Sequence, residues 1–183
     1  AGADTIVRGL RQAREDSTVR AIVLRVDSPG GSGTASDAIW REVALARRVK
    51  PIVASMGDYA ASGGYYVAMG ADEIAAQPGT ITGSIGVFSG KFSLRGLYGK
   101  LGVSQETVRR GHNATLFSSW EPWSPEERAR VRDLNEAFYA TFVAKAAEGR
   151  KKKPAEIEAV AQGRVWTGRE ALGAGLVDRL GGL

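Results

Sequence analysis

Short apolar runs alternate with amphipathic stretches along the sequence. Residues 21–26 (AIVLRV) and 51–56 (PIVASM) are almost continuously apolar and have the length of a strand, which is typical of strands covered on both faces. Strands that alternate with helices indicate an α/β domain with a mainly parallel sheet and flanking helices. Further strands are predicted over residues 72–77, 82–87, 103–109 and 163–166, and helices over residues 5–16, 34–48, 92–101, 124–149, 154–161 and 168–174.

A capping signal marks the start of the long helix. Ser124 is placed to cap it, Pro125 takes the first helical position, and Glu127 stands three residues after the serine, as a capping box requires. The basic run 150–153 (RKKK) follows the end of this helix. Such a run can attract anionic lipid or nucleic acid. We favour the alternative, a solvated turn whose cations lie near the negative end of the helix dipole, and we expect no nucleic-acid partner.

The composition limits the kind of protein this is. Its 183 residues, 43% of them apolar, suit one compact domain, and we predict a single domain over residues 1–183. Glycine is unusually frequent: its 24 residues concentrate in 28–33, 57–70 and 79–90, which indicates that backbone is shaped around a site there. The absence of cysteine excludes disulfides and thiolate catalysis. With only one histidine as well, we predict neither a metal nor a cofactor.

No segment reads as a membrane span or a secretory signal. No apolar run approaches the roughly 18–20 residues that span a bilayer. The opening residues, AGADTIVRGL, already fit a helix. We therefore expect the chain to be a fragment of a longer protein, with any targeting segment elsewhere in that parent chain.

Two glycine-rich segments follow predicted strands and precede predicted helices. Residues 27–33 (DSPGGSG) combine a proline with a glycine pair, a geometry that points backbone N–H groups into open space near a helix N-terminus. Their spacing matches neither a P-loop nor a dinucleotide-binding fingerprint. In residues 60–66 (AASGGYY), Ser62 has small neighbours and stands at a helix start, where free N–H groups stabilise a developing oxyanion. Taken alone, Ser62 fits a helix N-cap better than a nucleophile.

The two segments gain meaning from their positions in one sheet. The carboxyl ends of neighbouring parallel strands share a crevice in which ligands bind, and this favours Ser62 as a nucleophile. A third segment, residues 80–87 (TITGSIGV), would place Thr82 and Ser84 on one face of an extended stretch, so that a hydroxyl can reach the same crevice. A plain strand with turn glycines explains that third segment better from its pattern alone.

A general base for Ser62 is harder to find. The one histidine, His112, stands in a loop-like RGHN stretch, where we expect a structural or solvated side chain rather than a member of a Ser–His–Asp triad. What remains for a serine peptidase is a lysine base kept neutral by burial.

The segments together resemble the signal peptide peptidase A (protease IV) family, within the ClpP/crotonase-like fold. By this resemblance Ser62 is the nucleophile, and Ser84 hydrogen-bonds the lysine base. The backbone at Gly30, Gly31 and Gly63 surrounds the oxyanion. The matching stretches are LRVDSPGGSGTASDAIWREV, PIVASMGDYAASGGYYVAMGADEI, TITGSIGVF and QGRVWTGREALGAGLVDRLG, and they cover nearly the whole chain in the family's order.

One departure from the family pattern concerns the base. Single-domain members carry the lysine in a Gly-x-x-Lys stretch, and here Ala114 takes that position in GHNA. The pattern is similar to the C-terminal half of double-length members, in which serine and lysine sit on different halves. We therefore expect the lysine from the N-terminal half of the parent chain and almost no activity from this chain alone. A local substitute, Lys91 or Lys100, is the alternative.

The resemblance also implies partners and a location. The family degrades remnant signal peptides, so we expect apolar signal-peptide substrates, a homo-oligomer, and contact with the membrane through the parent chain. We expect the bacterial inner membrane, with the peptidase domain on the periplasmic, extracytoplasmic side. Tyr65 and Tyr66 suit an apolar substrate groove, although packing in the core explains them at least as well. Two other functions stay open: a catalytically silent scaffold or binding module on the same fold, and a crotonase-type acyl-CoA enzyme that does not need Ser62.

Overall fold

The computed structural model describes residues 2–182, and the chain divides into two compact units. The first comprises the residues up to Val87 and those from Phe138 onward, and the second comprises residues 88–137. The second boundary falls inside one long helix. All five residues assigned above to the nucleophile and its surroundings lie in the first unit. The prediction of a single domain within a longer chain stays a prediction.

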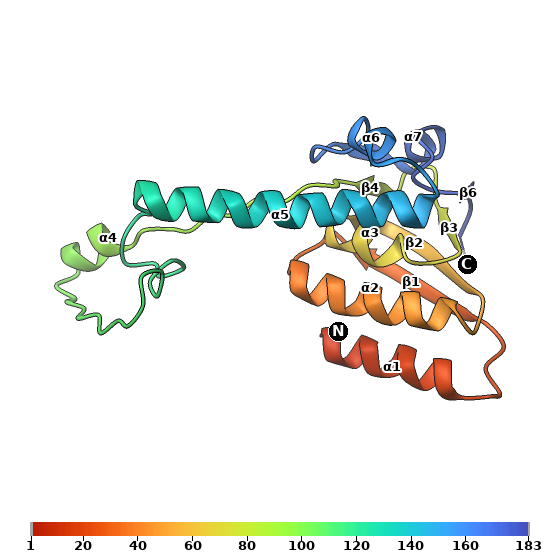
Figure 1. Cartoon of the computed structure of the whole chain (residues 1–183), viewed down its shortest axis with the longest axis horizontal. Coiled ribbons are helices and arrows are strands. Elements are labelled where there is room, and N and C mark those ends of the chain that lie inside the picture. Colours follow the sequence, from red (N-terminus) through yellow and green to blue (C-terminus); the bar gives the residue numbers. More distant parts are fainter. Residues whose placement is uncertain (1, 183) are drawn as a thin grey trace. The chain divides into compact units, whose positions relative to one another are not determined.

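Strands and helices alternate along the chain (Figure 1), which confirms the α/β class. The strands are β1 (Ile22–Ser28), β2 (Ile52–Ala61), β3 (Glu73–Ala76), β4 (Ile81–Gly83), β5 (Val165–Thr167) and β6 (Arg179–Leu180). The helices are α1 (Ala3–Glu15), α2 (Gly33–Arg47), α3 (Gly63–Ala68), α4 (Arg95–Lys100), α5 (Pro125–Arg150), α6 (Pro154–Glu158) and α7 (Gly168–Gly173).

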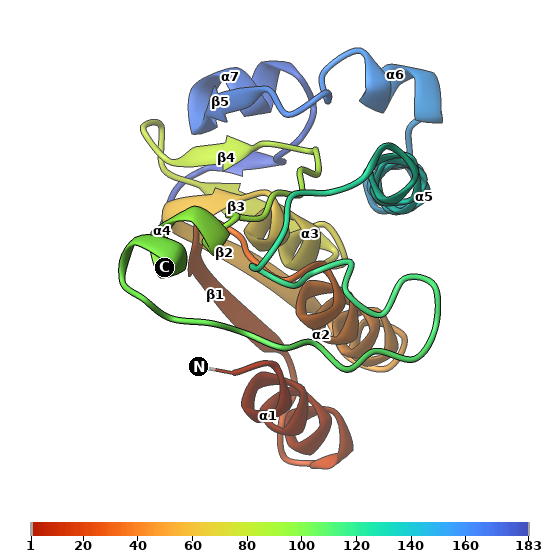
Figure 2. The same cartoon turned by 90° about the vertical axis from the view of Figure 1, so that its left-hand side faces the viewer.

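The strands form one mainly parallel sheet organised around β2. Strand β1 pairs with β2 along nearly its whole length, whereas β3 and β4 pair with successive parts of β2's other edge, all in parallel. Strand β6 extends the sheet beyond β3 in parallel, and β5 pairs with β4 antiparallel. Helices α2 and α3 lie on one side of this sheet (Figure 2). The carboxyl ends of β1, β2 and β4 therefore meet at the same edge, as the site requires.

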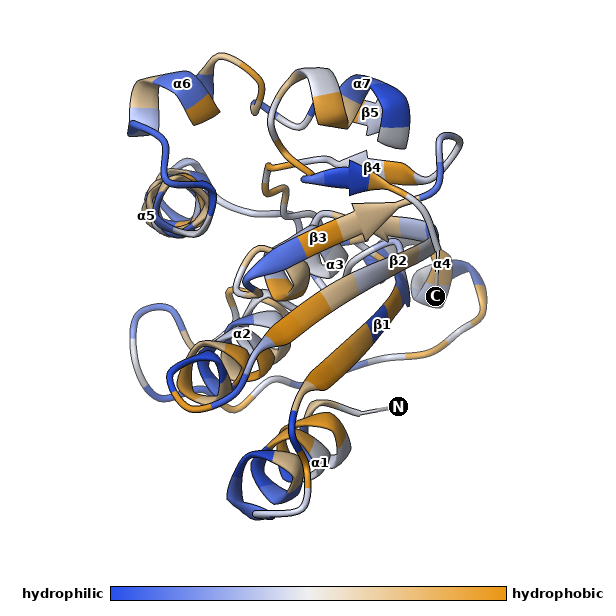
Figure 3. Ribbon diagram, turned by 90° about the vertical axis from the view of Figure 1, so that its right-hand side faces the viewer, coloured by the Kyte–Doolittle hydropathy of each residue, from blue (hydrophilic) through white to orange (hydrophobic). Residues whose placement is uncertain are grey.

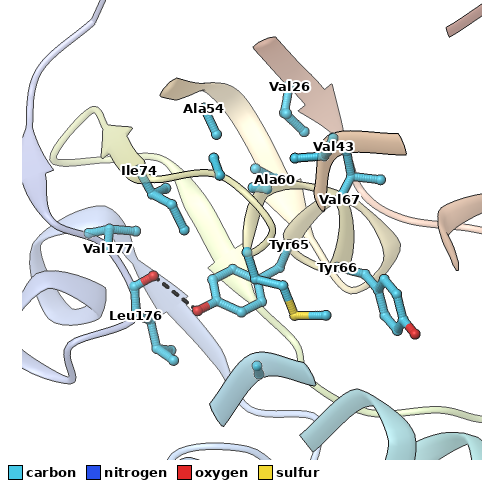
Figure 4. Close-up of a cluster of buried hydrophobic side chains, with 14 of the residues drawn as sticks. Val26, Val43, Ala54, Ala60, Tyr65, Tyr66, Val67, Ile74, Leu176 and Val177 are labelled. Carbon is cyan, nitrogen blue, oxygen red and sulfur yellow. Dashed lines mark hydrogen bonds between the residues drawn. The ribbon is translucent and has the colours of Figure 1, made fainter. Parts of the chain in front are cut away.

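Buried apolar side chains fill the space between the sheet and its helices. Apolar colouring follows much of β1 and β2 in Figure 3, as their sequences predict. Figure 4 shows Tyr65 in the middle of this cluster and Tyr66 at its side, and at most 1% of either residue is exposed. The Tyr65 hydroxyl donates a hydrogen bond to the carbonyl of Leu176 at 3.0 Å. Of the two interpretations given to these tyrosines, core packing is the correct one.

Most predicted boundaries agree with the structure, and the differences are informative. Strand β2 runs five residues beyond the predicted end at Met56 and leads directly into Ser62. The capping box of α5 is confirmed: the N–H of Glu127 donates to Ser124 Oγ at 3.1 Å, and the N–H of Ser124 donates to the Glu127 carboxylate at 2.8 Å. The strand predicted over residues 103–109 is wrong, because that segment has no neighbouring strand to pair with among the described residues.

The basic run lies at the end of α5, but its first residue is buried and ion-paired rather than solvated. The Arg150 guanidinium, only 7% exposed, makes a two-point ion pair with the carboxylate of Asp178, which lies 28 residues away. Burial lowers the pKa of Arg150, but the bond to Asp178, together with the electrostatic interactions with Tyr65 and Asp178, outweighs burial and the net shift of the pKa is upward. At least this member of the run therefore ties the C-terminal segment to α5. Among the described residues, no helix is long and apolar enough to cross a membrane.

Candidate active site

Ser62 occupies a strained turn between β2 and α3. Its backbone angles, φ 50° and ψ −116°, lie in a region that residues with a side chain rarely adopt and that costs about 1–3 kcal/mol. The N–H of Ser62 donates to the carbonyl of Gly83 at 2.9 Å, and its own carbonyl accepts from Tyr66 N–H at 2.8 Å. Although Ser62 holds the N-cap position of α3, its hydroxyl makes no capping hydrogen bond. The Ser62 hydroxyl therefore does not act as the N-cap that its position in the sequence suggested.

The glycine pair after β1 packs directly against this turn. Gly30 and Gly31 have φ angles of +112° and +146°, which favour glycine. A Cβ added to Gly30 would lie 2.8 Å from the nitrogen of Gly63 and 2.9 Å from Cβ of Ser62. A Cβ added to Gly63 would lie 3.2 Å from the nitrogen of Gly31. The two loops touch through backbone because side chains are absent from both.

This contact brings two backbone N–H groups together beside Ser62. Within the described chain, neither the N–H of Gly31 nor that of Gly63 donates to another backbone carbonyl. Gly63 begins α3, and Gly31 precedes the start of α2 by two residues, so both lie near the positive ends of helix dipoles. Paired, unused N–H donors next to a nucleophile are what stabilises an oxyanion.

Side chains at the start of α2 hold the glycine loop in place. Ser32 caps α2, its hydroxyl accepting from the N–H of Ala35 at 3.3 Å. Ser36, which is buried, donates from its hydroxyl to the carbonyl of Ser32 at 3.0 Å. The Ser36 oxygen also lies 2.5 Å from the point where Gly63 would carry a Cβ. Ser36, on α2, thus packs against the turn that contains Ser62 and Gly63. The sequence analysis missed it because a serine in a first helical turn carries no distinctive signal.

Ser84 is the neighbour of Ser62 on the adjacent strand. The register pairs Ala61 with Gly83, so each serine lies one residue beyond that pair. Ser84 also has a positive φ, 49°, and its N–H donates to the carbonyl of Arg164 at 2.7 Å. Trp166 packs over Gly83, with a ring carbon 2.6 Å from where a Cβ would stand. The turn at Ser84 is therefore fixed from the β5 side.

Thr82 does not share this position, and the expectation that it faces the crevice is wrong. Its side chain is fully buried, and its hydroxyl donates to the carbonyl of Ala60 at 2.7 Å. Thr82 thus joins β4 to β2 within the sheet. Only Ser84 of the two lies next to Ser62 in the strand register.

Two tyrosines anchor α3 behind Ser62. Beyond the bond from Tyr65 to Leu176, the Tyr66 hydroxyl donates to the carboxylate of Asp37 at 2.6 Å. Lys145, from α5, forms an ion pair with the same carboxylate and lies 3.7 Å from the centre of the Trp40 ring. Burial raises the pKa of Asp37, but the bonds from Lys145 and Tyr66 outweigh it and the net shift is downward. Sequence patterns could not reveal this cluster, because Asp37 and Lys145 are 108 residues apart.

No described lysine of the first unit contacts Ser62. Lys50 donates to backbone carbonyls at the end of α1, and Lys145 is held by Asp37. Lys91 and Lys100 belong to the second unit, in which Lys91 lies 5.6 Å from the centre of the Trp123 ring. His112, also in that unit, is exposed and bonded to Glu126 at 2.9 Å. Among the described residues, no three metal-ligating side chains come together.

Comparison with known proteins shows the family of this chain. A sequence model of peptidase family S49 matches residues 44–183. The chain is 46% identical to "Serine protease SPPA, chloroplastic" of Arabidopsis thaliana, 44% identical to "Protease 4" of Salmonella typhi, and 39% identical to "Protease 4" of Haemophilus influenzae. These matches cover 98–99% of this chain but only 27–29% of the three relatives. The chain therefore spans less than a third of the length of these three relatives.

Proposed function

The chain belongs to peptidase family S49, and on that premise we propose that Ser62 is the nucleophile of a serine peptidase whose base comes from another domain. The observation that carries the proposal is the contact of two glycine loops around a strained serine. A Cβ on Gly30 would collide with both Ser62 and the nitrogen of Gly63. Strain of this kind is retained where the surrounding structure supports it, commonly at active sites.

The chemistry follows from the positions of these groups. Ser62 Oγ attacks the peptide carbonyl carbon as its proton passes to the base, and the carbonyl oxygen becomes an oxyanion. The N–H groups of Gly31 and Gly63 are placed to donate to that oxyanion. Collapse breaks the C–N bond, and the departing amine takes the proton from the base. Water then attacks the acyl-enzyme with help from the same base and regenerates Ser62.

The base we propose is a lysine on the N-terminal half of the parent chain, completing a Ser/Lys dyad. Ala114 stands where single-domain members carry their lysine, and the lysines of the first unit are engaged elsewhere or lie beyond α5. Ser84, beside Ser62, would hold the incoming lysine through its hydroxyl. A general base contributes about 10²–10⁴-fold to the rate, so the chain alone should be nearly inactive.

We further propose apolar segments of remnant signal peptides as substrates. Tyr65 and Tyr66 do not line a groove, but two other apolar side chains near the site are exposed. Val165, paired with Gly83 in the strand register, is 56% exposed, and Tyr59 in β2 is 51% exposed. The parent protein is proposed to act as a homo-oligomer at the bacterial inner membrane, with this domain outside the cytoplasm.

Hydrolysis of an internally quenched apolar peptide tests the proposal. The chain is assayed alone and with the lysine-bearing half, with Ser62→Ala as the inactive variant and Ser17→Ala, an exposed serine after α1, as its matched control. We expect activity only when both halves are present, lost in Ser62→Ala and kept in Ser17→Ala. Activity of the lone chain that disappears in Lys91→Ala would contradict the base in trans. Inactivity of both halves together would favour the silent scaffold.

A further inference from the structure

Helix α3 follows the strained serine directly but is too short to fix its own direction. It spans only the six residues Gly63–Ala68, and isolated helices shorter than about 12 residues are marginal in water. Ser62, with φ 50°, keeps a conformation that persists only where the surrounding structure enforces it. The contacts that fix α3 therefore also fix Ser62 and the N–H of Gly63.

Tyr66 is the residue of α3 that is bonded at both of its ends. Its backbone N–H donates to the carbonyl of Ser62 at 2.8 Å, and its hydroxyl donates to the carboxylate of Asp37 in α2 at 2.6 Å. The residue is only 1% exposed, and Figure 4 shows its hydroxyl pointing away from that of Tyr65. Tyr66 therefore connects the main chain of Ser62 to a single carboxylate.

Helix α5 covers Tyr66 and Asp37 with one face. Phe138, Phe142 and Lys145 stand at positions i, i+4 and i+7, which lie on the same side of a helix. The rings of Phe138 and Phe142 lie 5.7 Å and 4.7 Å from that of Tyr66, measured between centroids. Lys145 forms the ion pair with Asp37, and its Nζ lies 5.5 Å from the centre of the Tyr66 ring. The aromatic ring and the carboxylate are thus held by the same helix.

The first turns of α2 also reach the turn at Ser62. The Ser36 oxygen lies 2.5 Å from the point where Gly63 would carry a Cβ, and Ser36 directly precedes Asp37. At Gly33, where α2 begins, the ring of Phe138 lies 2.6 Å from the corresponding Cβ position. Whatever holds Asp37 therefore also holds the part of α2 that packs against Gly63.

We propose that Asp37, held by Lys145, is a positioning residue for the peptidase reaction. It acts through Tyr66 and fixes the direction in which the Ser62 hydroxyl and the Gly63 N–H point. The inference rests on the proposed function, and Asp37 takes no proton in it. A displacement of about 1 Å at a reacting group can cost about 10²-fold in rate. Because the oxyanion exists only after the attack, the loss should fall on kcat and leave KM unchanged.

Glu42 supplies a matched control in the same helix. Its carboxylate pairs with Arg11 and Arg14 of α1, so it faces a different neighbour from that of Asp37. The Glu42 side chain is only 5% exposed, compared with 43% for Asp37, so its removal should cost at least as much free energy of unfolding. Glu42→Ala therefore destabilises α2 without removing a bond to α3.

Hydrogen exchange of the Tyr66 amide, measured by NMR on the full 183-residue chain, is the first arm of the test. This N–H is bonded to the Ser62 carbonyl, so its exchange rate reports local opening of the turn. We expect exchange to be at least about tenfold faster in Asp37→Ala than in Glu42→Ala. This arm needs no peptidase activity. Equal exchange rates in the two variants would overturn the proposal.

Kinetics of the chain together with the lysine-bearing half provide the second arm. Asp37→Ala should lower kcat for an internally quenched apolar peptide at least about tenfold with KM within about twofold, whereas Glu42→Ala should keep both. Lys145→Met should also lower kcat, and Lys145→Arg, which keeps the charge and the contact with the ring of Trp40, should restore it.

The two arms separate a positioning role from a purely structural one. Faster exchange in Asp37→Ala with an unchanged kcat would mean that Asp37 only stabilises the fold, and would overturn the inference while the proposed function stands. A loss of kcat that Glu42→Ala shares would overturn it in the same way. An inactive natural complex, by contrast, would overturn the proposed function and this inference with it.

Discussion

Replacing Gly30 by alanine tests whether the loop after β1 really packs against Ser62. Two costs add in this variant. A residue with a side chain is strained at φ +112°, at about 1–3 kcal/mol. The new methyl would also stand 2.8 Å from the nitrogen of Gly63, and relieving such overpacking costs about 1–3 kcal/mol more.

The adjacent glycine supplies the matched control. Gly31 also has a positive φ, +146°, but a Cβ there would meet nothing within 4 Å. Gly31→Ala should therefore show the strain alone, about 1–3 kcal/mol, while Gly30→Ala loses about 2–6 kcal/mol of unfolding free energy. For a chain of this size each kcal/mol lowers Tm by about 2–4 °C, so the two variants should differ by several degrees.

Denaturant titration followed by circular dichroism measures both variants against the natural chain. Because the isolated chain is expected to be nearly inactive, its free energy of unfolding is measured instead of its activity. This free energy reports the contact between the loop after β1 and the turn at Ser62, and the measurement does not need the lysine-bearing half. Equal losses in Gly30→Ala and Gly31→Ala would refute the reasoning. That result would mean that the loop and the turn at Ser62 do not touch as described.

Three further predictions concern the strained serine, the buried tyrosine and acid stability. Ser62→Gly should be more stable than Ser62→Ala by about 1 kcal/mol in urea, because glycine tolerates φ 50°; equal stability would argue against strain. Tyr65→Phe should lose about 1–3 kcal/mol of unfolding free energy, because the buried Leu176 carbonyl loses its donor, and an unchanged urea midpoint would contradict this. Burial raises the pKa of Asp178, but Arg150 and a backbone N–H lower it further, so its net pKa lies below 3.8. The stabilising contribution of Asp178 should be complete above that value and disappear as the pH falls through the lower folded-state pKa, at about 1.4 kcal/mol per unit of pKa difference. The urea midpoint of Asp178→Asn should therefore depend less on pH between 5 and 2 than that of the natural chain. Parallel pH profiles of the two proteins would contradict this.

Local sequence patterns predicted much of the fold because the deciding features are themselves local. Apolar runs marked β1 and β2, and the residues Ser124 and Glu127 marked the start of α5 through a capping box. The glycine pair at residues 30–31 and the small residues around Ser62 likewise indicate positive φ angles or close backbone contacts at these positions. Their contact in space could be expected because both follow neighbouring parallel strands.

What the patterns could not supply depends on partners far away in the chain. Thr82 and Ser84 look alike in an extended segment, and only the position of β2 determines that one hydroxyl is buried. The cluster of Asp37 and Lys145 joins α2 to α5 across 108 residues. A strand is predicted over residues 103–109, but a strand also needs a neighbour, and a single-chain pattern does not say whether one exists.

The most direct test of the central claim is the intact mass of the chain after exposure to a serine-directed phosphonate. It is measured alone and with the lysine-bearing half of the parent chain, with Ser62→Ala in parallel. The account predicts a single adduct that requires both the second half and Ser62. Labelling of the lone chain at Ser62 would contradict the base in trans, and absence of any adduct in either condition would contradict Ser62 as a nucleophile.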